Sequence, residues 1–163
     1  MTTFDPHKSL GFQCEITLKA FIRNLSQRLD GTGISPTQFR ALAHLMADGP
    51  QVQAELCELL SISPPSMVKL IDRMERDGWV VRQADALDRR VNKVTCTEQA
   101  KEIWEEATIH SINLLEQAYR GIDPDEIESA IRLLMRIRKN LETPRNDDQK
   151  KKSKTKCADI LVD

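Results

Sequence analysis

The residues best suited to bind a ligand lie at the start of one predicted helix. Met67, Ile71 and Met74 recur at helical spacing within Pro64–Asp77, which predicts an amphipathic helix. The polar and cationic residues on its other side are Ser63, Pro65, Ser66, Lys69 and Arg73. Short side chains there let the backbone approach base edges in a major groove, and Lys69 reaches a guanine edge or a phosphate. A capped helix with a hydrated polar face fits this segment equally well.

A second charged group lies in a predicted turn between two short strands. Trp79–Arg82 and Val91–Cys96 are rich in valine and predict a hairpin. Its tip carries Asp88, Arg89 and Arg90. Arg82 and Lys93 are expected to add positive charge at its base. An extended arginine fits the negative potential of a narrow minor groove. A hydrated turn is the plain alternative, but a helix-turn-helix directly upstream favours binding to nucleic acid.

Cysteines and histidines show no spacing typical of a metal site or a catalytic centre. The chain holds Cys14, Cys57, Cys96, Cys157, His7, His44 and His110. No CxxC pair occurs and no histidine lies at ligand spacing from a cysteine, so we expect reduced thiols, no metal and no cofactor. The sequence also lacks a glycine-rich phosphate loop and a G-x-S-x-G motif, which argues against an enzyme.

The elements that hold these residues are predicted to be mainly helical. Short helices are expected at Thr37–Ala47, Val52–Leu60 and Pro64–Asp77, before the hairpin. Ser35-Pro36, Ser63-Pro64 and Asp123-Pro124 are typical helix starts, with a capping residue followed by proline, and Gly78 is a typical helix end. Longer helices are expected at 10–29, from 95–98 to Tyr119, and at 124–141.

Short helices followed by a hairpin predict a winged helix-turn-helix, so the fold class is mainly α with a small β-hairpin wing. We expect a winged DNA-binding domain at 34–97 and a helical dimerisation region at 9–30 and 98–142. The long helices carry more apolar surface than the small winged core covers, which indicates a homodimer. Residues 143–163 are lysine-rich and predict a disordered basic tail, which adds phosphate contacts or is simply a soluble end.

Charge and hydropathy exclude further classes of protein. The chain has 24 lysines and arginines against 25 acids, and residues 35–100 hold eight cations and nine acids. We therefore expect modest, salt-sensitive non-specific affinity for DNA. Aromatic residues are scarce, which argues against a base-stacking platform for single strands. The sequence has no membrane-length apolar run and no secretory signal, so a cytoplasmic protein is expected.

The sequence resembles the MarR family of bacterial transcription regulators, most closely its SlyA-like branch. The resemblance spans about residues 9–142, and its most specific part is the D-x-R wing that follows the helix-turn-helix. The stretches that carry it are ISPTQFRALAHL, AELCELLSISPPSMVKLIDRMERDGWVVRQ, DRRVNKVTCTEQAKEI and GIDPDEIESAIRLLMRIRKNL.

This resemblance implies an obligate homodimer that reads a pseudo-palindromic operator in double-stranded DNA. Pro65, Ser66 and Lys69 match the base-contacting part of the recognition helix, although family members often have arginine in place of Lys69. Arg90 matches the arginine placed in the minor groove, with Asp88 and Arg89 framing it. The family commonly represses transcription until a small, often phenolic, ligand binds between the dimer helices and the winged domain.

Three alternatives remain open at this stage. Lys19 and Arg23 are candidate partners for an anionic ligand, or plain surface cations. Cys14 lies in the region where one branch of the family senses peroxide, but the tyrosines of that branch are absent. A winged helix that binds protein instead of DNA is the other competing class.

Overall fold

Polar capping residues followed by proline begin three of the helices, as the sequence predicts. Ser35 accepts a hydrogen bond from the backbone N–H of Gln38, and the Gln38 side chain accepts one from the Ser35 N–H at 2.9 Å. This completes a capping box. Ser63 and Asp123 likewise accept hydrogen bonds from N–H groups in the first turns of their helices. Proline fits the first helical position because it has no N–H to satisfy.

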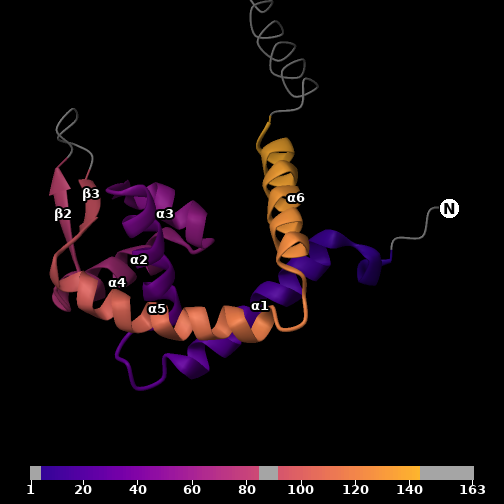
Figure 1. Cartoon of the computed structure of the whole chain (residues 1–163). Coiled ribbons are helices and arrows are strands. Elements are labelled where there is room, and N and C mark those ends of the chain that lie inside the picture. The colour runs from indigo at the N-terminus through magenta and orange to yellow at the C-terminus, as the bar shows by residue number, and fades with distance from the viewer. Residues whose placement is uncertain (1–4, 85–91, 144–163) are drawn as a thin grey trace, which may run out of the picture. The chain divides into compact units, whose positions relative to one another are not determined.

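The computed structural model describes residues 5–84 and 92–143, which fall into two units (Figure 1). The first unit ends at Ala118 and the second begins at Tyr119. The elements of the first unit are η1 (Pro6–Lys8), α1 (Leu10–Arg28), α2 (Pro36–Asp48), β1 (Gln51–Val52), α3 (Gln53–Leu60), α4 (Pro64–Arg76), β2 (Val80–Ala84), β3 (Asn92–Cys96) and α5 (Gln99–Ala118). The second unit contains α6 (Pro124–Glu142). The mainly helical fold class is thus confirmed.

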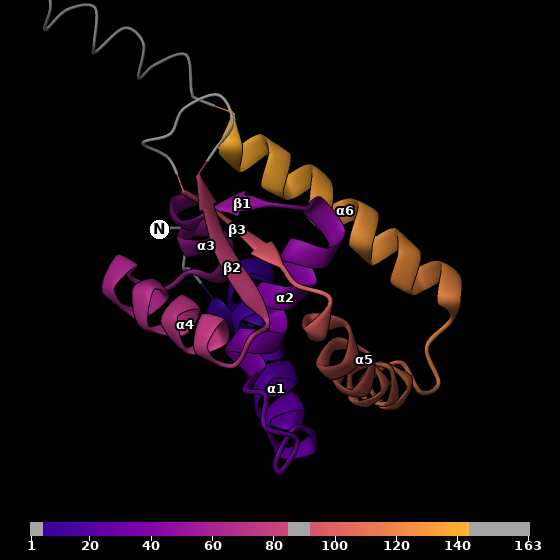
Figure 2. The ribbon, with the colours of Figure 1, turned by 90° about the vertical axis from the view of Figure 1, so that its left-hand side faces the viewer.

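The sheet has three strands where the sequence predicted a two-stranded hairpin. All pairs are antiparallel in the order β1-β3-β2, with Arg82 opposite Val94 and Gln51 also opposite Val94 (Figure 2). The prediction of Val52 as the first helical residue was wrong, since Val52 lies in β1 and caps α3. A strand of two residues is too short to show an alternating pattern, so no pattern of residues predicts it.

A single apolar core joins the helices of the first unit to the sheet. Its largest fully buried apolar side chains are Leu42, Leu56, Met67, Ile71, Met74, Val80 and Val94. Phe39 on α2 stacks on Trp104 of α5, with ring centroids 5.1 Å apart and planes 15° apart. This contact fixes the start of the long helix α5 against the winged core.

Long apolar side chains on α1 and α5 remain outside this core. Leu25 is the only buried residue of α1, with Leu29 buried just after the helix ends. The exposed residues on the two helices are Leu10, Phe12, Ile16, Leu18, Ile109, Ile112 and Leu115. Patches of this kind are rare on monomeric proteins and mark interaction surfaces.

Helix α6 of the second unit is amphipathic, and none of its own residues is buried. Its exposed apolar residues on α6 are Ile131, Leu133, Leu134, Met135 and Leu141. The predicted tail lies outside the described residues, apart from Thr143. None of the helices in the two described stretches has the length and apolar character of a membrane span.

Candidate nucleic-acid interface

Helix α4 separates a buried face from an exposed polar one. Met67, Ile71 and Met74 are fully buried in the core. The five residues singled out from the sequence, Ser63, Pro65, Ser66, Lys69 and Arg73, are all exposed. Residues three and four apart on a helix are neighbours, so Ser66, Lys69 and Arg73 form one row on the outer side. The structure therefore brings these predicted residues onto one continuous surface.

The turn between α3 and α4 presents the start of α4 to solvent. Ser61 takes a left-handed conformation with φ of 54°, and its N–H donates to the carbonyl of Glu58 at 3.2 Å. The N–H of Ile62 donates to the carbonyl of Cys57 at 3.1 Å. These bonds end α3 as a Schellman motif does, without the usual glycine. The chain then enters α4 within two residues, which makes a helix-turn-helix.

The cations on the exposed face of α4 differ in whether they form ion pairs with acidic side chains. Lys69 and Arg76 form no ion pair with any other residue of the described chain. Arg73 lies near its own helix end, with Nε 3.8 Å from the Asp77 carboxylate. The hydroxyl oxygens of Ser63 and Ser66 are 2.9 Å apart and share a hydrogen bond. Lys69 is thus the cation at the start of the row that is available to an anionic partner.

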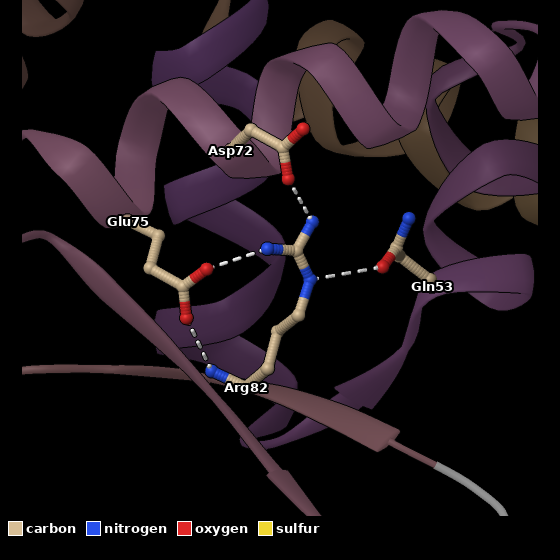
Figure 3. A network of polar contacts seen from close by, with 4 residues as sticks. All are labelled: Gln53, Asp72, Glu75 and Arg82. Carbon is tan, nitrogen blue, oxygen red and sulfur yellow. Dashed lines mark hydrogen bonds and ion pairs between the residues drawn. The ribbon is translucent and has the colours of Figure 1, made fainter.

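Arg82 does not supply the free positive charge predicted at the base of the wing. Its guanidinium binds Asp72 at 2.6 Å and Glu75 at 2.5 Å, and Nε donates to the Gln53 side chain at 3.3 Å (Figure 3). Burial opposes the charge, but the hydrogen bonds and attraction of the two carboxylates outweigh it and raise the pKa of Arg82 above its ordinary value. Its charge is therefore already neutralised.

The wing is described only up to the ends of its two strands. Lys93 is half-buried on β3, opposite Gln83 of β2 and Val52 of β1. The predicted minor-groove residues Asp88, Arg89 and Arg90 lie outside the described residues. In the sequence, these three residues belong to the segment that connects β2 to β3.

Comparison with known proteins identifies the family of the helix-turn-helix. Residues 32–91, which include α2, the helix-turn-helix and β2 and end just before β3, match the model of the MarR family. The chain carries a MarR family domain. YkoM of Bacillus subtilis strain 168, named an uncharacterized HTH-type transcriptional regulator, is 31% identical over 103 residues, which are 63% of this chain and 66% of that relative. MarR proteins are transcription regulators and not enzymes. Membership of the SlyA-like branch stays a prediction.

Solved structures show that the MarR fold extends beyond this domain. MarR of E. coli in its apo form aligns over 79% of this chain and 96% of its own, with a TM-score of 0.68 and 23% identity. CouR of Rhodococcus jostii RHA1, solved with p-coumaroyl-CoA bound, aligns over 82% of this chain and 93% of its own, with a TM-score of 0.68 and 21% identity. At these identities the likeness establishes the fold alone.

Lys19 and Arg23, the predicted ligand-binding cations, lie on exposed positions of α1 outside the MarR domain match. Lys19 contacts Glu15 at 2.6 Å, and its hydrogen bond and positive charge hold the pKa of Glu15 below the ordinary value. A pocket of about 150 Å³ lies between α1 and α5, lined in part by Phe21, Asn24 and Gln117. Neither cation lines this pocket, so a ligand role for them stays a prediction.

The cysteines occupy distinct environments. Cys14 is exposed on α1, while Cys57 and Cys96 are half-buried. Burial raises the pKa of the Cys96 thiol to about 11, so this thiol is protonated at neutral pH. Cys157 lies outside the described residues. Within residues 5–84 and 92–143, no group of three or more histidine, cysteine or acidic side chains is arranged to hold a metal ion.

Proposed function

We propose that this chain is a homodimeric transcription regulator that binds double-stranded DNA sequence-specifically. In this proposal each subunit places α4 in a major groove and the turn carrying Arg90 in the adjacent minor groove. The operator is then a pseudo-palindrome, because two subunits related by a twofold axis read two half-sites. The regulator acts as a repressor in the bacterial cytoplasm.

The exposed row of Ser66, Lys69 and Arg73 carries this proposal. It stands on the second helix of a helix-turn-helix whose opposite face is fully buried, so the helix cannot rotate to hide it. Serine and lysine supply hydrogen bonds to base edges, and the helix N-terminus attracts a phosphate. An interaction module for proteins would present apolar side chains on this row instead.

Unpaired apolar surface supports the homodimer. Exposed leucines and isoleucines recur on α1 and α5 of the first unit and along α6 of the second. A second copy buries such surface by pairing the same patches across a twofold axis. We assign 9–30 and 98–142 to this dimerisation region and 34–97 to DNA binding.

Release by a small molecule is the regulatory part of the proposal. CouR, which shares the fold, was solved with p-coumaroyl-CoA, a phenolic and anionic thioester. By analogy we propose a small phenolic or anionic effector, with Lys19 and Arg23 as its candidate ionic partners. Oxidation of Cys14 is the competing mode of control, and the exposure of this thiol is its only support.

The experiment that tests DNA binding starts from a pool of random-sequence duplexes, from which the protein selects its site. Anisotropy titrations then compare the wild type with Lys69→Ala and Arg90→Ala. Lys69→Ala should lower affinity for the selected duplex by about 1–3 kcal/mol. Arg132→Ala, which removes an exposed α6 arginine paired with Glu128, is the control for lost charge. Failure to enrich any sequence would reject the proposal in favour of a protein-binding winged helix.

A further inference from the structure

One guanidinium connects three elements of the winged domain. Arg82 on β2 binds Asp72 and Glu75 of α4 through its two terminal nitrogens, and Gln53 of α3 through Nε. Its backbone N–H also donates to the second oxygen of Glu75 at 3.1 Å. Glu75 is thus bound by both the main chain and the side chain of the same strand residue (Figure 3).

This arrangement restrains the angle between the wing and the recognition helix. The Arg82 side chain is only 24% exposed, so water and salt screen its two ion pairs less than those at the open surface. A planar guanidinium binds its partners in fixed directions, unlike the point charge of lysine. Moving β2 along or away from α4 therefore breaks several charge-assisted hydrogen bonds together.

The two restrained elements each carry part of the proposed DNA interface. Helix α4 presents Ser66 and Lys69, while β2 pairs with β3 and so fixes Lys93 opposite Gln83. To contact a rigid duplex together, α4 and the wing strands must lie at a fixed distance from each other. A displacement of about 1 Å is enough to lose these contacts. We infer that Arg82 is a positioning residue for DNA recognition, which holds the wing strands at a fixed angle to α4 through Asp72 and Glu75. This inference rests on the proposed function.

An effect of charge on DNA affinity can be distinguished from an effect of positioning, because the two predict opposite results when a carboxylate is removed. The cluster of Arg82, Asp72 and Glu75 carries one net negative charge, which repels phosphates. Removing a carboxylate should strengthen DNA binding if only charge matters. Removing it should weaken specific binding if the cluster positions the interface.

The test measures affinity for the selected duplex and for a scrambled duplex with Asp72→Asn, Arg82→Ala and Arg82→Lys. Asp72 is half-exposed, with 52% of its side chain accessible, so Asp72→Asn should keep the fold even if Arg82→Ala does not. We expect Asp72→Asn to lower affinity for the selected duplex roughly tenfold, with the scrambled duplex changed by less than about twofold. Arg82→Lys should be intermediate. Asp5→Asn and Lys8→Ala, at an exposed ion pair outside the regions assigned to dimerisation and DNA binding, should leave both affinities unchanged.

The ratio of the two affinities decides the outcome, because partial unfolding lowers both equally. Unchanged or stronger specific binding by Asp72→Asn overturns the positioning role. An equal loss on both duplexes by Asp72→Asn, in a variant that unfolds at the same urea concentration as the wild type, also overturns it. If the wild type binds both duplexes equally, the proposed function is rejected. If the wild type prefers the selected duplex and the variants bind it as tightly as the wild type does, only the positioning role of Arg82 is rejected.

Discussion

The hydroxyl of Thr97 donates a hydrogen bond to the carbonyl oxygen of Gly78 at 2.6 Å, which joins the start of α5 to the turn that follows α4. The same hydroxyl oxygen accepts from the N–H of Ala100 at 3.3 Å and so caps α5. Trp79 adds a second link, since its carbonyl accepts from the Thr97 N–H at 3.0 Å. The turn after α4 and the start of the long helix α5 are thus joined by polar contacts.

Thr97→Val should destabilise the protein by about 1–2 kcal/mol. The change removes the cap of α5 and leaves the Gly78 carbonyl without this partner. Urea unfolding at one fixed protein concentration measures the loss, since stability of a dimer depends on concentration. Thr97→Ser keeps the hydroxyl and should stay close to the wild type. A loss for Thr97→Ser, with Thr97→Val close to the wild type, would show that packing of the methyl group matters instead.

Gly78→Ala should cost about 1–2 kcal/mol through backbone strain. Gly78 has φ of +78°, where a side chain is unfavourable. An added Cβ would also lie 2.4 Å from the Gln99 side-chain oxygen, but that flexible side chain can move away. Gly31→Ala is the matched control, because φ of Gly31 is +83° and a Cβ added there would meet no neighbouring atom within 4 Å. If Gly78→Ala costs far more than Gly31→Ala and Gln99→Ala restores the difference, the contact and not the backbone dominates.

The contribution of Cys96 to stability should fall as pH rises from about 9 to about 11. Burial raises the pKa of this thiol from its ordinary 9.0 to about 11. Between these values the unfolded chain releases the proton while the folded chain keeps it, so the contribution is complete below pH 9 and lost toward pH 11. Urea unfolding of the wild type and Cys96→Ala at pH 8.5 and 10.5 isolates this contribution. If the free energy of unfolding changes equally with pH in the wild type and in Cys96→Ala, the pH dependence does not come from Cys96.

Leu134→Lys should raise the dimer dissociation constant by at least about tenfold. Leu134 is 43% exposed on the apolar side of α6, and burying a lysine in an interface is costly. Sedimentation across a range of protein concentrations measures the shift. Ser129→Lys adds the same charge on the polar side of α6 and should leave association unchanged. An unaltered dimer in Leu134→Lys would exclude α6 from the interface.

Local signals predicted most of the helices and the exposed row on α4. Capping residues, proline and apolar periodicity determine helix ends through contacts within a few residues, as at Ser35 and Asp123. The same periodicity places Met67 and Met74 inward and so leaves Lys69 outward.

Features that depend on distant residues were not predictable in this way. Strand β1 exists because Gln51 pairs with Val94, far along the chain, and two residues carry no pattern of their own. From the sequence, Arg82 is expected to add positive charge at the base of the wing, because no spacing links it to Asp72 and Glu75. Their pairing follows only when β2 packs against α4. Ser61 gave no signal for a left-handed turn, since glycine or asparagine is the usual residue there.

DNA recognition by α4 is tested by a salt titration of wild-type binding to the selected duplex and to its scrambled counterpart. We predict tighter binding to the selected duplex at every salt concentration, with affinity for both falling steeply as salt rises. Equal, negligible binding to both duplexes would contradict DNA recognition by α4 and leave the winged domain as a protein-binding surface.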